Sequence, residues 1–130
     1  SDVLQEAQAS GVDVAEFASA VASLSIRLQA LEMTSLRILS QADSGETIGA
    51  EPSMLKLKGS QLVQAMDELL FDAIGYWSLP LDRAVAGDQA IGPEYAEFVA
   101  SGRYHHRGYT IAGGSSEVQH NIIAKQVLGL

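Results

Sequence analysis

The stretch from residue 13 to residue 43 reads DVAEFASAVASLSIRLQALEMTSLRILSQAD and contains neither glycine nor proline. Asp13 is a favoured N-cap residue, and Glu16 three positions later completes a capping-box pattern. Apolar residues then recur at alternating steps of four and three, at Phe17, Val21, Leu24, Leu28, Leu31 and Ile38, with Ser35 in the one polar slot. This spacing is typical of one helix face. The stretch therefore predicts a helix of about 30 residues, ~45 Å long.

The same stretch carries a second apolar stripe, formed by Ile26, Met33 and Leu36. Residues two positions apart lie about 200° apart around a helix, so these three cannot face the same core as the first stripe. A helix at the edge of a small bundle needs only one apolar stripe. The second stripe predicts an interface with another domain or another subunit.

A proline and a glycine indicate where the next helix begins and ends. Pro52 is suited to a first helical turn, and Gly75 is suited to a helix end, so we expect a helix over 53–74. The segment Tyr76–Pro93 is rich in glycine, proline and polar residues and reads as irregular structure.

Two further helices are expected towards the C-terminus. A short one follows Gly92 and Pro93, over 94–100, and the last runs over 115–128 with Ser115 as its cap. The inner face of the last helix is predicted to contain Val118, Ile122, Ile123 and Val127. No stretch alternates with the period of a strand. The sequence therefore predicts an all-α fold, an antiparallel up-down four-helix bundle.

Composition limits the possible classes of protein. The 130 residues are 47% hydrophobic and 18% charged, as expected for one globular domain, and the net charge is -8. No basic stripe suits nucleic acid, and no apolar run reaches the ~20 residues of a membrane span. Cysteine is absent, which excludes disulfides and thiolate chemistry. We expect a cytoplasmic protein without nucleic-acid or membrane partners.

The three histidines do not predict a metal site. His105 and His106 are adjacent and point to different sides of regular structure, and no carboxylates have ligand spacing to His120. The segment Thr110–His120 is more informative, because two glycines precede a serine-capped helix. Its free backbone amides and hydroxyls suit an anion or a polar ring edge, and Arg103 and Arg107 would add positive charge. An ordinary N-cap explains the same residues.

The last twenty residues, from Ile111 to Leu130, closely resemble the end of acyl-CoA dehydrogenases, where Ile-Tyr-Gly-Gly-Thr/Ser-x-Glu-Ile-Gln-Arg-Asn-Ile-Ile-Ala is a common bacterial form. The stretch Glu51–Gln61 is similar to the Ala-Ser-x-x-Lys-Leu-x-Gly-Ser-Glu helix of this family, and Ile91–Ala96 followed by Arg103-Tyr104 resembles a loop of bacterial members. The resemblance implies that residues 13–130 are the C-terminal helical domain of a larger parent chain. Residues 1–12 are expected to be a lead-in, a tag remnant or a frayed helix.

The resemblance also implies a cofactor and its contacts. The parent reaction is the FAD-dependent α,β-dehydrogenation of an acyl-CoA thioester, in fatty acid metabolism. Ser115 stands where the threonine of the family hydrogen-bonds the flavin, after Gly114, and Glu117 stands at a Gln/Glu that approaches FAD. Gly75 stands at a Gly-Gly-Tyr/Asn-Gly turn that contacts the FAD of a neighbouring subunit, although that turn is degenerate here.

The sequence departs from the family at the catalytic base. Many members have a glutamate directly before the second glycine, and this position is Gly113. Ala112 replaces a tyrosine and His120 an arginine, and the Arg-x-x-Phe-Gly segment is missing. We therefore assign no catalytic residue and no metal ligand, and expect the chain alone to be inactive, with the base on an earlier helix of the parent.

Three interpretations follow. The chain is the FAD-contacting and oligomerisation domain of a homo-oligomeric dehydrogenase, a dimer or tetramer. Alternatively, it is the same domain in a non-catalytic subunit of a heteromeric dehydrogenase, or a free-standing helical interaction module. Domains upstream of Ser1 would distinguish the three.

Overall fold

The computed structural model describes residue 11 and residues 13–79 and 96–130. Within these residues all regular structure is helical, and the α-helices are α2 (Val14–Asp43), α3 (Glu51–Ile74), α4 (Val99–Arg107) and α5 (Ser116–Ile123). Short 3-10 segments follow α3 (η1, Gly75–Ser78) and α4 (η4, Gly108–Thr110), and a π-helical turn (η5, Ala124–Leu128) continues α5. The predicted all-α fold is confirmed.

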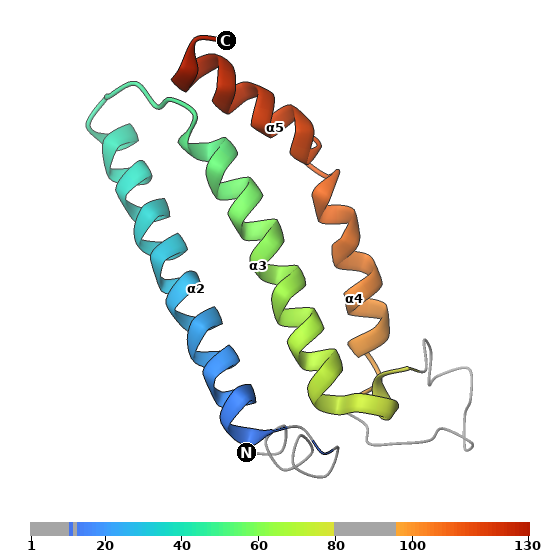
Figure 1. The fold of residues 1–130 in the computed structure, drawn as a ribbon. Coiled ribbons are helices and arrows are strands. Elements are labelled where there is room, and N and C mark those ends of the chain that lie inside the picture. The colour runs from blue at the N-terminus through green and yellow to red at the C-terminus, as the bar shows by residue number, and fades with distance from the viewer. Residues whose placement is uncertain (1–10, 12, 80–95) are drawn as a thin grey trace.

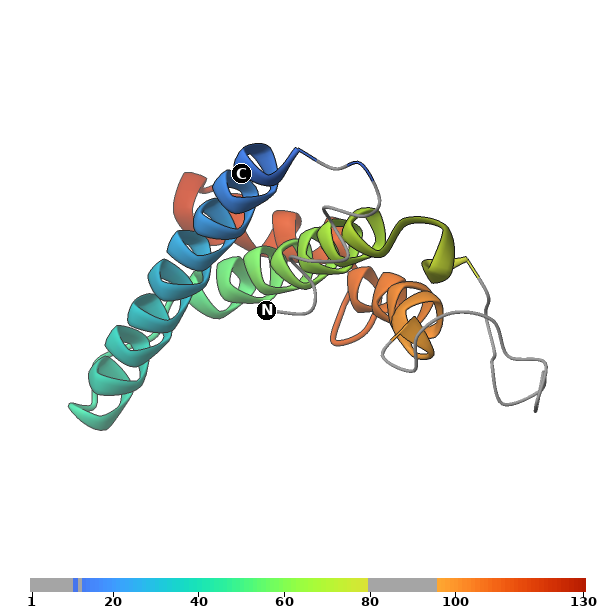
Figure 2. The same ribbon diagram turned by 90° about the horizontal axis from the view of Figure 1, so that it is seen from below.

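The helices form a layer with α3 at its centre (Figure 1). Helix α2 runs antiparallel to α3. Helices α4 and α5 follow one another along the other side of α3, and both run parallel to α2. Seen from below, α2 and α4 lie on opposite sides of α3 (Figure 2). The up-down alternation is therefore present in three columns, and the third column consists of two helices placed end to end.

Helix α2 begins and ends where the sequence predicts, whereas α3 begins two residues earlier than predicted, at Glu51, and ends as predicted at Ile74. Asp13 caps α2, since its Oδ1 accepts hydrogen bonds from the backbone N–H groups of Ala15 (2.8 Å) and Glu16 (3.3 Å). Pro52 lies in the first turn of α3, and Gly75 ends α3 at a φ of 62°. The buried Ser78 hydroxyl fixes the turn after α3 by donating to the carbonyl oxygens of Phe71 (3.2 Å) and Gly75 (2.6 Å).

The short helix expected over 94–100 is placed wrongly. The helix in this region, α4, begins at Val99 and continues to Arg107, through a polar stretch that has no apolar period. Residues Tyr76–Ser78 of the expected loop form η1, whereas 80–93, residues 94 and 95, and the expected lead-in over 1–12 except Gly11 lie outside the described residues.

The last helix is capped by Ser115 as predicted, but its inner face differs. Val118 and Val127 are 48% and 65% exposed, whereas Gln119 is buried at 8%. Ile122 and Ile123 are half-buried. The reason is that the buried position is taken by an amide with a specific partner, since Gln119 donates from Nε2 to the carbonyl oxygen of Gly113.

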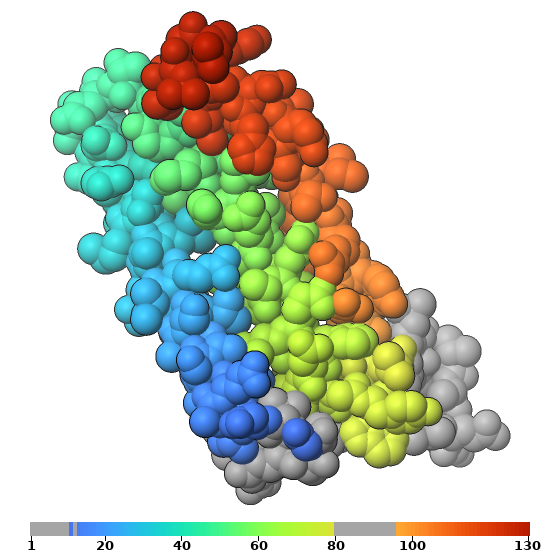
Figure 3. Space-filling model, viewed as in Figure 1, coloured from blue at the N-terminus to red at the C-terminus, as the bar shows by residue number. Residues whose placement is uncertain are grey.

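The second stripe of α2 remains uncovered by the described residues. Ile26, Met33 and Leu36 are 68%, 66% and 59% exposed. Of the 30 residues of α2 only Phe17 and Ile38 are buried, and Phe17 packs against Leu69 and Ala73 of α3. In the space-filling view α2 forms one edge of the molecule (Figure 3). The prediction that these three residues do not share the core of the first stripe is confirmed, and the interface expected for them stays a prediction.

Helix α2 is also apolar and long enough, by length and composition only, to cross a membrane. This is weak evidence, because an unpaired charged side chain at the centre of a bilayer is costly. Arg27, Glu32 and Arg37 are distributed from the middle of α2 towards its C-terminal end. Exposed apolar surface on a domain of this size is more typical of a protein interface.

Candidate functional site

The segment between α4 and α5 has the geometry of an open, glycine-lined turn. Gly113 and Gly114 adopt φ angles of 70° and 95°, in the left-handed region, and both residues are exposed. Ser115 then caps α5, since its Oγ accepts a hydrogen bond from the N–H of Val118 (3.3 Å). The structure therefore brings Gly114, Ser115 and Glu117 together at one helix N-terminus, as the sequence predicts.

Gln119 holds this turn in place. Its buried side chain donates from Nε2 to the carbonyl oxygen of Gly113 (3.0 Å). A Cβ atom at Gly114 would lie 2.7 Å from this same Nε2, whereas a Cβ at Gly113 would meet nothing within 4 Å. Gly114 is therefore required both by its φ angle and by the closeness of the Gln119 amide. Sequence reasoning missed Gln119, because an isolated glutamine gives no signal of burial.

Glu117 is ionised more readily than an ordinary glutamate. A hydrogen bond from its own backbone amide, and then one from the Ser115 hydroxyl, lower the pKa of Glu117, and His120 and Lys56 contribute smaller charge effects. A carboxylate at a helix N-terminus is favoured by the helix dipole as well. A lowered pKa makes Glu117 a weak base, so its place at this turn does not make it a proton acceptor for catalysis.

Helix α3 holds the backbone just before the glycine turn. Lys56 donates from Nζ to the carbonyl oxygen of Thr110 (3.3 Å), and the Ser116 hydroxyl donates to the same oxygen (3.4 Å). A cavity of about 340 Å³ lies beside this contact, lined by Lys56, Ser60, Tyr109, Ala112 and Gly113. The turn therefore borders a partly polar hollow over α3.

Gly75 does not belong to this cluster. It ends α3, nineteen residues beyond Lys56, which corresponds to about 28 Å along the helix. The carbonyl oxygen of Gly75 already accepts the Ser78 hydroxyl. A ligand held by Ser115 and a ligand touching Gly75 therefore occupy two separate places.

The two arginines upstream of the turn share one carboxylate partner on α3. Arg103 donates from Nε (3.0 Å) and Nη2 (2.7 Å) to Glu68 Oε2, and Arg107 donates to Glu68 Oε1. Arg103 also stacks on the ring of Phe71, 4.3 Å from its centroid. Glu68 of α3 pairs with both arginines and balances one of their two positive charges, so one net positive charge remains upstream of the turn.

The ion pairs shift the pKa of both partners in the direction that stabilises charge. The hydrogen bonds from Arg103, and then the charges of Arg103 and Arg107, lower the pKa of Glu68 despite its partial burial. The hydrogen bond to Glu68 likewise raises the pKa of Arg103. Sequence reasoning missed Glu68, although its place on α3, away from the apolar face that contains Leu55 and Leu62, could have indicated a contact with another helix.

The histidines do not form a metal cluster among residues 11, 13–79 and 96–130. His106 Nδ1 lies 2.8 Å from Asp67 Oδ2, and Gln64 donates to the backbone carbonyl of His106 (3.1 Å). His105 and His120 are exposed. The Asp67–His106 contact serves the packing of α4 on α3.

The turn suits one edge of a flat, polar ligand. The exposed glycine pair offers backbone that no side chain covers, and the capped N-terminus of α5 lies directly beside it. These groups fit a polar ring edge such as that of a flavin. They form one wall, so the remaining contacts to such a ligand must come from groups beyond the described residues.

The fold and the turn define a helical domain that presents a serine-capped helix N-terminus after a glycine pair. A family model described as "Acyl-CoA dehydrogenase, C-terminal domain" matches residues 4–128. The chain belongs to this family. Comparisons with curated proteins and with solved structures find no match.

Replacing Gly114 tests the role of Gln119. We expect Gly114→Ala to lower the free energy of unfolding by about 2 kcal/mol, because it combines a strained φ with a displaced buried amide. Gly113→Ala is the matched control and is expected to cost about 1 kcal/mol, from backbone strain alone. Urea denaturation measures both. In the background of Gln119→Ala the two glycine variants should become equal, and a persistent difference would contradict the contact.

The lowered pKa of Glu68 predicts a dependence of stability on pH. A group whose pKa is lower in the folded state stabilises the fold above its unfolded pKa of about 4.3, and this contribution disappears as pH falls through the folded pKa. At neutral pH we expect Glu68→Gln to lower the Tm by about 2–4 °C. The difference from wild type should shrink as pH falls below about 4.3 and vanish once pH lies below the lowered pKa of Glu68 in the folded state. Glu46→Gln, at an exposed loop residue, is the control and should show no such loss.

Proposed function

We propose that this chain is the C-terminal FAD-contacting and oligomerisation domain of an FAD-dependent acyl-CoA dehydrogenase. The observation that carries the proposal is the Gly113–Ser115 turn, whose exposed backbone and capped helix N-terminus suit the edge of a flavin. When bound, FAD would accept the hydride from the β carbon of an acyl-CoA thioester as the α proton leaves. The role of this domain is to hold and orient one edge of the cofactor.

Within this proposal the residues of the turn have separate tasks. Gly114 leaves room for the Gln119 amide, which fixes the path of the backbone. The Ser115 hydroxyl donates to Glu117 and accepts from the N–H of Val118, and its remaining lone pair can accept a hydrogen bond at the cofactor edge. Glu117 carries a negative charge near this edge, and Lys56 partly balances it.

Gly75 contributes to a different cofactor. Its distance of about 28 Å from Lys56 along α3 separates it from the Ser115 turn. A contact between Gly75 and FAD therefore requires the flavin of a neighbouring subunit. This supports an oligomeric enzyme, either homomeric or with a partner subunit of the same family.

A second candidate function is a non-catalytic subunit of a heteromeric dehydrogenase. The observation in its favour is Gly113, which stands where many family members have the catalytic glutamate. The nearby carboxylate of Glu117 has a lowered pKa and is a weak base. Either the base comes from another part of the parent, or a partner subunit supplies it.

Flavin content tests the cofactor contact. The 130-residue chain is expected to purify without stoichiometric flavin, whereas the complete product of its gene should carry FAD, measured by absorbance. In that complete protein Ser115→Ala should lower FAD occupancy and Ser115→Thr should retain it. Asp13→Ala removes a helix cap of the same kind at a remote place, costing about 1 kcal/mol, and should leave flavin content unchanged.

The outcomes separate the two candidates. Dehydrogenation of acyl-CoA by the complete protein alone supports the homomeric enzyme, and activity only with a second subunit supports the heteromeric one. Full FAD occupancy of the Ser115→Ala variant would contradict the proposed contact.

Self-association tests the oligomerisation role. We expect light scattering to show a dimer or larger species at tens of micromolar, because burying the second stripe should outweigh repulsion between chains of net charge -8, which salt screens beyond about 8 Å. Ile26→Glu combined with Met33→Glu should give a monomer with unchanged helicity by circular dichroism. A wild-type chain that stays monomeric would refute this role.

A further inference from the structure

The uncovered side of α2 extends well beyond its three large apolar residues. Along the helix, positions at alternating steps of four and three form a line that we call the outer seam: Ala15, Ser19, Ala22, Ile26, Gln29, Met33, Leu36 and Ser40. Every residue of the outer seam is exposed. Steps of four and three are the heptad spacing of helices that pack along their full length.

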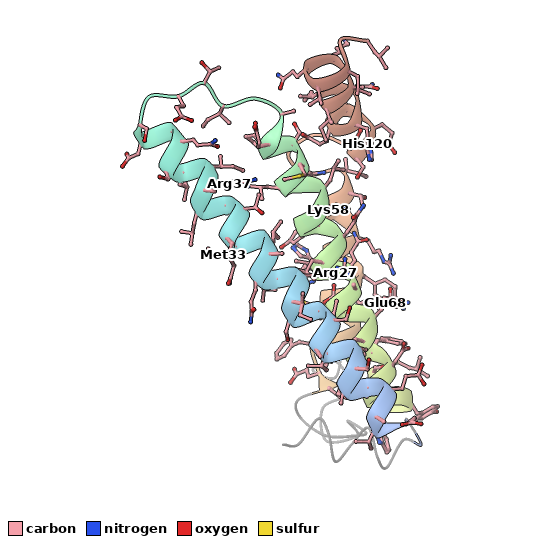
Figure 4. All side chains as sticks on the ribbon, turned by 60° about the vertical axis from the view of Figure 1, so that its left-hand side comes forward. Arg27, Met33, Arg37, Lys58, Glu68 and His120 are labelled. Carbon is pink, nitrogen blue, oxygen red and sulfur yellow. The ribbon has the colours of Figure 1, made fainter. Side chains whose placement is uncertain are left out.

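The outer seam lies opposite the contact between α2 and α3. The residues of α2 that face α3 include Phe17, Leu24, Leu31 and Ile38, each two positions from a residue of the outer seam and so about 200° from it. Figure 4 shows Met33 on the side of α2 turned away from α3. A helix could therefore lie along the outer seam without touching α3.

The sizes of the side chains indicate the direction of such a helix. The first half of the outer seam contains only small residues, Ala15, Ser19 and Ala22, and the large apolar residues follow in the second half. A second copy packed in parallel would place large side chains against large side chains at one end of the outer seam, and small side chains against small ones at the other end. An antiparallel copy places Met33 against Ala22 and Leu36 against Ser19, which keeps the helix axes at an even spacing of about 8–10 Å.

Charge selects the same arrangement and fixes its register. When Met33 of one chain faces Ala22 of the other, the flanking positions bring Arg37 beside Glu16, twice by symmetry. Both side chains are exposed, and no ion pair within residues 13–79 and 96–130 engages either one. On the other flank the exposed Leu39 lies against Ala18, and Glu32 lies against Ser25.

Neighbouring registers are less favourable. A slide of one heptad in one direction places Glu32 against Glu32 of the second copy and Ile26 against Leu36. A slide in the other direction shortens the overlap, leaves Arg37 without Glu16 and leaves Leu36 uncovered. Gln29 lies near the centre of the favoured register, where a polar residue disfavours slippage.

We propose that two copies of this chain pair through an antiparallel contact of their α2 helices, with Met33 facing Ala22 and Arg37 beside Glu16. The inference rests on the oligomerisation part of the proposed function and adds the occupant, direction and register of the interface. Three observations support the proposal: the exposed outer seam, the match of large to small side chains along it, and the complementary charges of Arg37 and Glu16.

Cysteine cross-linking tests the register, since the chain has no cysteine of its own. In the proposed pairing, Ala22→Cys and Met33→Cys variants mixed in equal amounts should form a disulfide between them under mild oxidation, because facing positions fall within the ~4.4–6.8 Å between Cα atoms that a disulfide needs. Each variant alone should not cross-link, because its two cysteines lie eleven residues, about 16 Å, apart along the helices. Ala15→Cys mixed with Met33→Cys reports the shorter register and should stay uncross-linked.

Charge reversal gives an independent test. Arg37→Glu should weaken the dimer about fivefold in Kd, because two exposed ion pairs are lost. The double variant Glu16→Arg with Arg37→Glu should restore wild-type affinity, measured by analytical ultracentrifugation. Arg27→Glu, on the same helix and away from these flanks, is the control.

The outcomes distinguish this inference from the oligomerisation it rests on. A monomeric wild-type chain overturns both. A dimer in which Ala22→Cys or Met33→Cys cross-links by itself indicates parallel helices and overturns the inference alone. A dimer that cross-links in none of these combinations, or an unrestored double charge variant, also overturns the proposed register and leaves oligomerisation standing.

Discussion

The structure depends on one constraint, which is that α3 must be packed on two opposite sides. Its apolar side, with Leu62, Leu69 and Ala73, receives α2, and its other side receives α4 and α5. The second contact combines an apolar cluster that includes Ile74 and Val99 with several polar pairs. Glu68 pairs with Arg103 and Arg107, and Asp67 and Gln64 hold His106. Because α2 and α4 pack on opposite sides of α3, α3 determines where α2 lies relative to α4.

The candidate site owes its position to this polar contact. Glu68, Gln64 and Lys56 contact the third column at successive levels, at Arg103, at the carbonyl of His106 and at the carbonyl of Thr110. Gly113 and Gly114 follow directly, and the Gln119 amide closes the turn. The sequence suggested Arg103 and Arg107 as charges for a ligand. In the structure they pair with Glu68 and so help to align the backbone that presents Ser115. In physical terms, charged groups between helices position the site, and exposed backbone forms it.

The sequence was sufficient where local chemistry decides the structure. The Asp13 cap, Pro52 in a first turn, Gly75 at a helix end and Ser115 before α5 each act within a few residues, and the structure has all four in the predicted places. Helix α4 was misplaced because its polar residues owe their helical state to pairing with Glu68, a contact 35 residues away in sequence. The burial of Gln119 and the exposure of Val118 were missed for the same reason, since periodicity counts apolar residues and cannot register a buried amide with one specific partner. Of the proposed site, Gly114, Ser115 and Glu117 were found together, and Gly75 was found to lie apart.

The thinness of the layer has a consequence for its dynamics. A helix of 30 residues in which only Phe17 and Ile38 are buried has little tertiary stabilisation of its own. Native proteins open in cooperative units, and the units with the fewest buried contacts open first. Helix α2 is such a unit, whereas α3 and α4 are joined by ion pairs. We therefore expect the amide protons of α2 to exchange with solvent faster than those of α3, and to slow wherever a partner covers the outer side of α2.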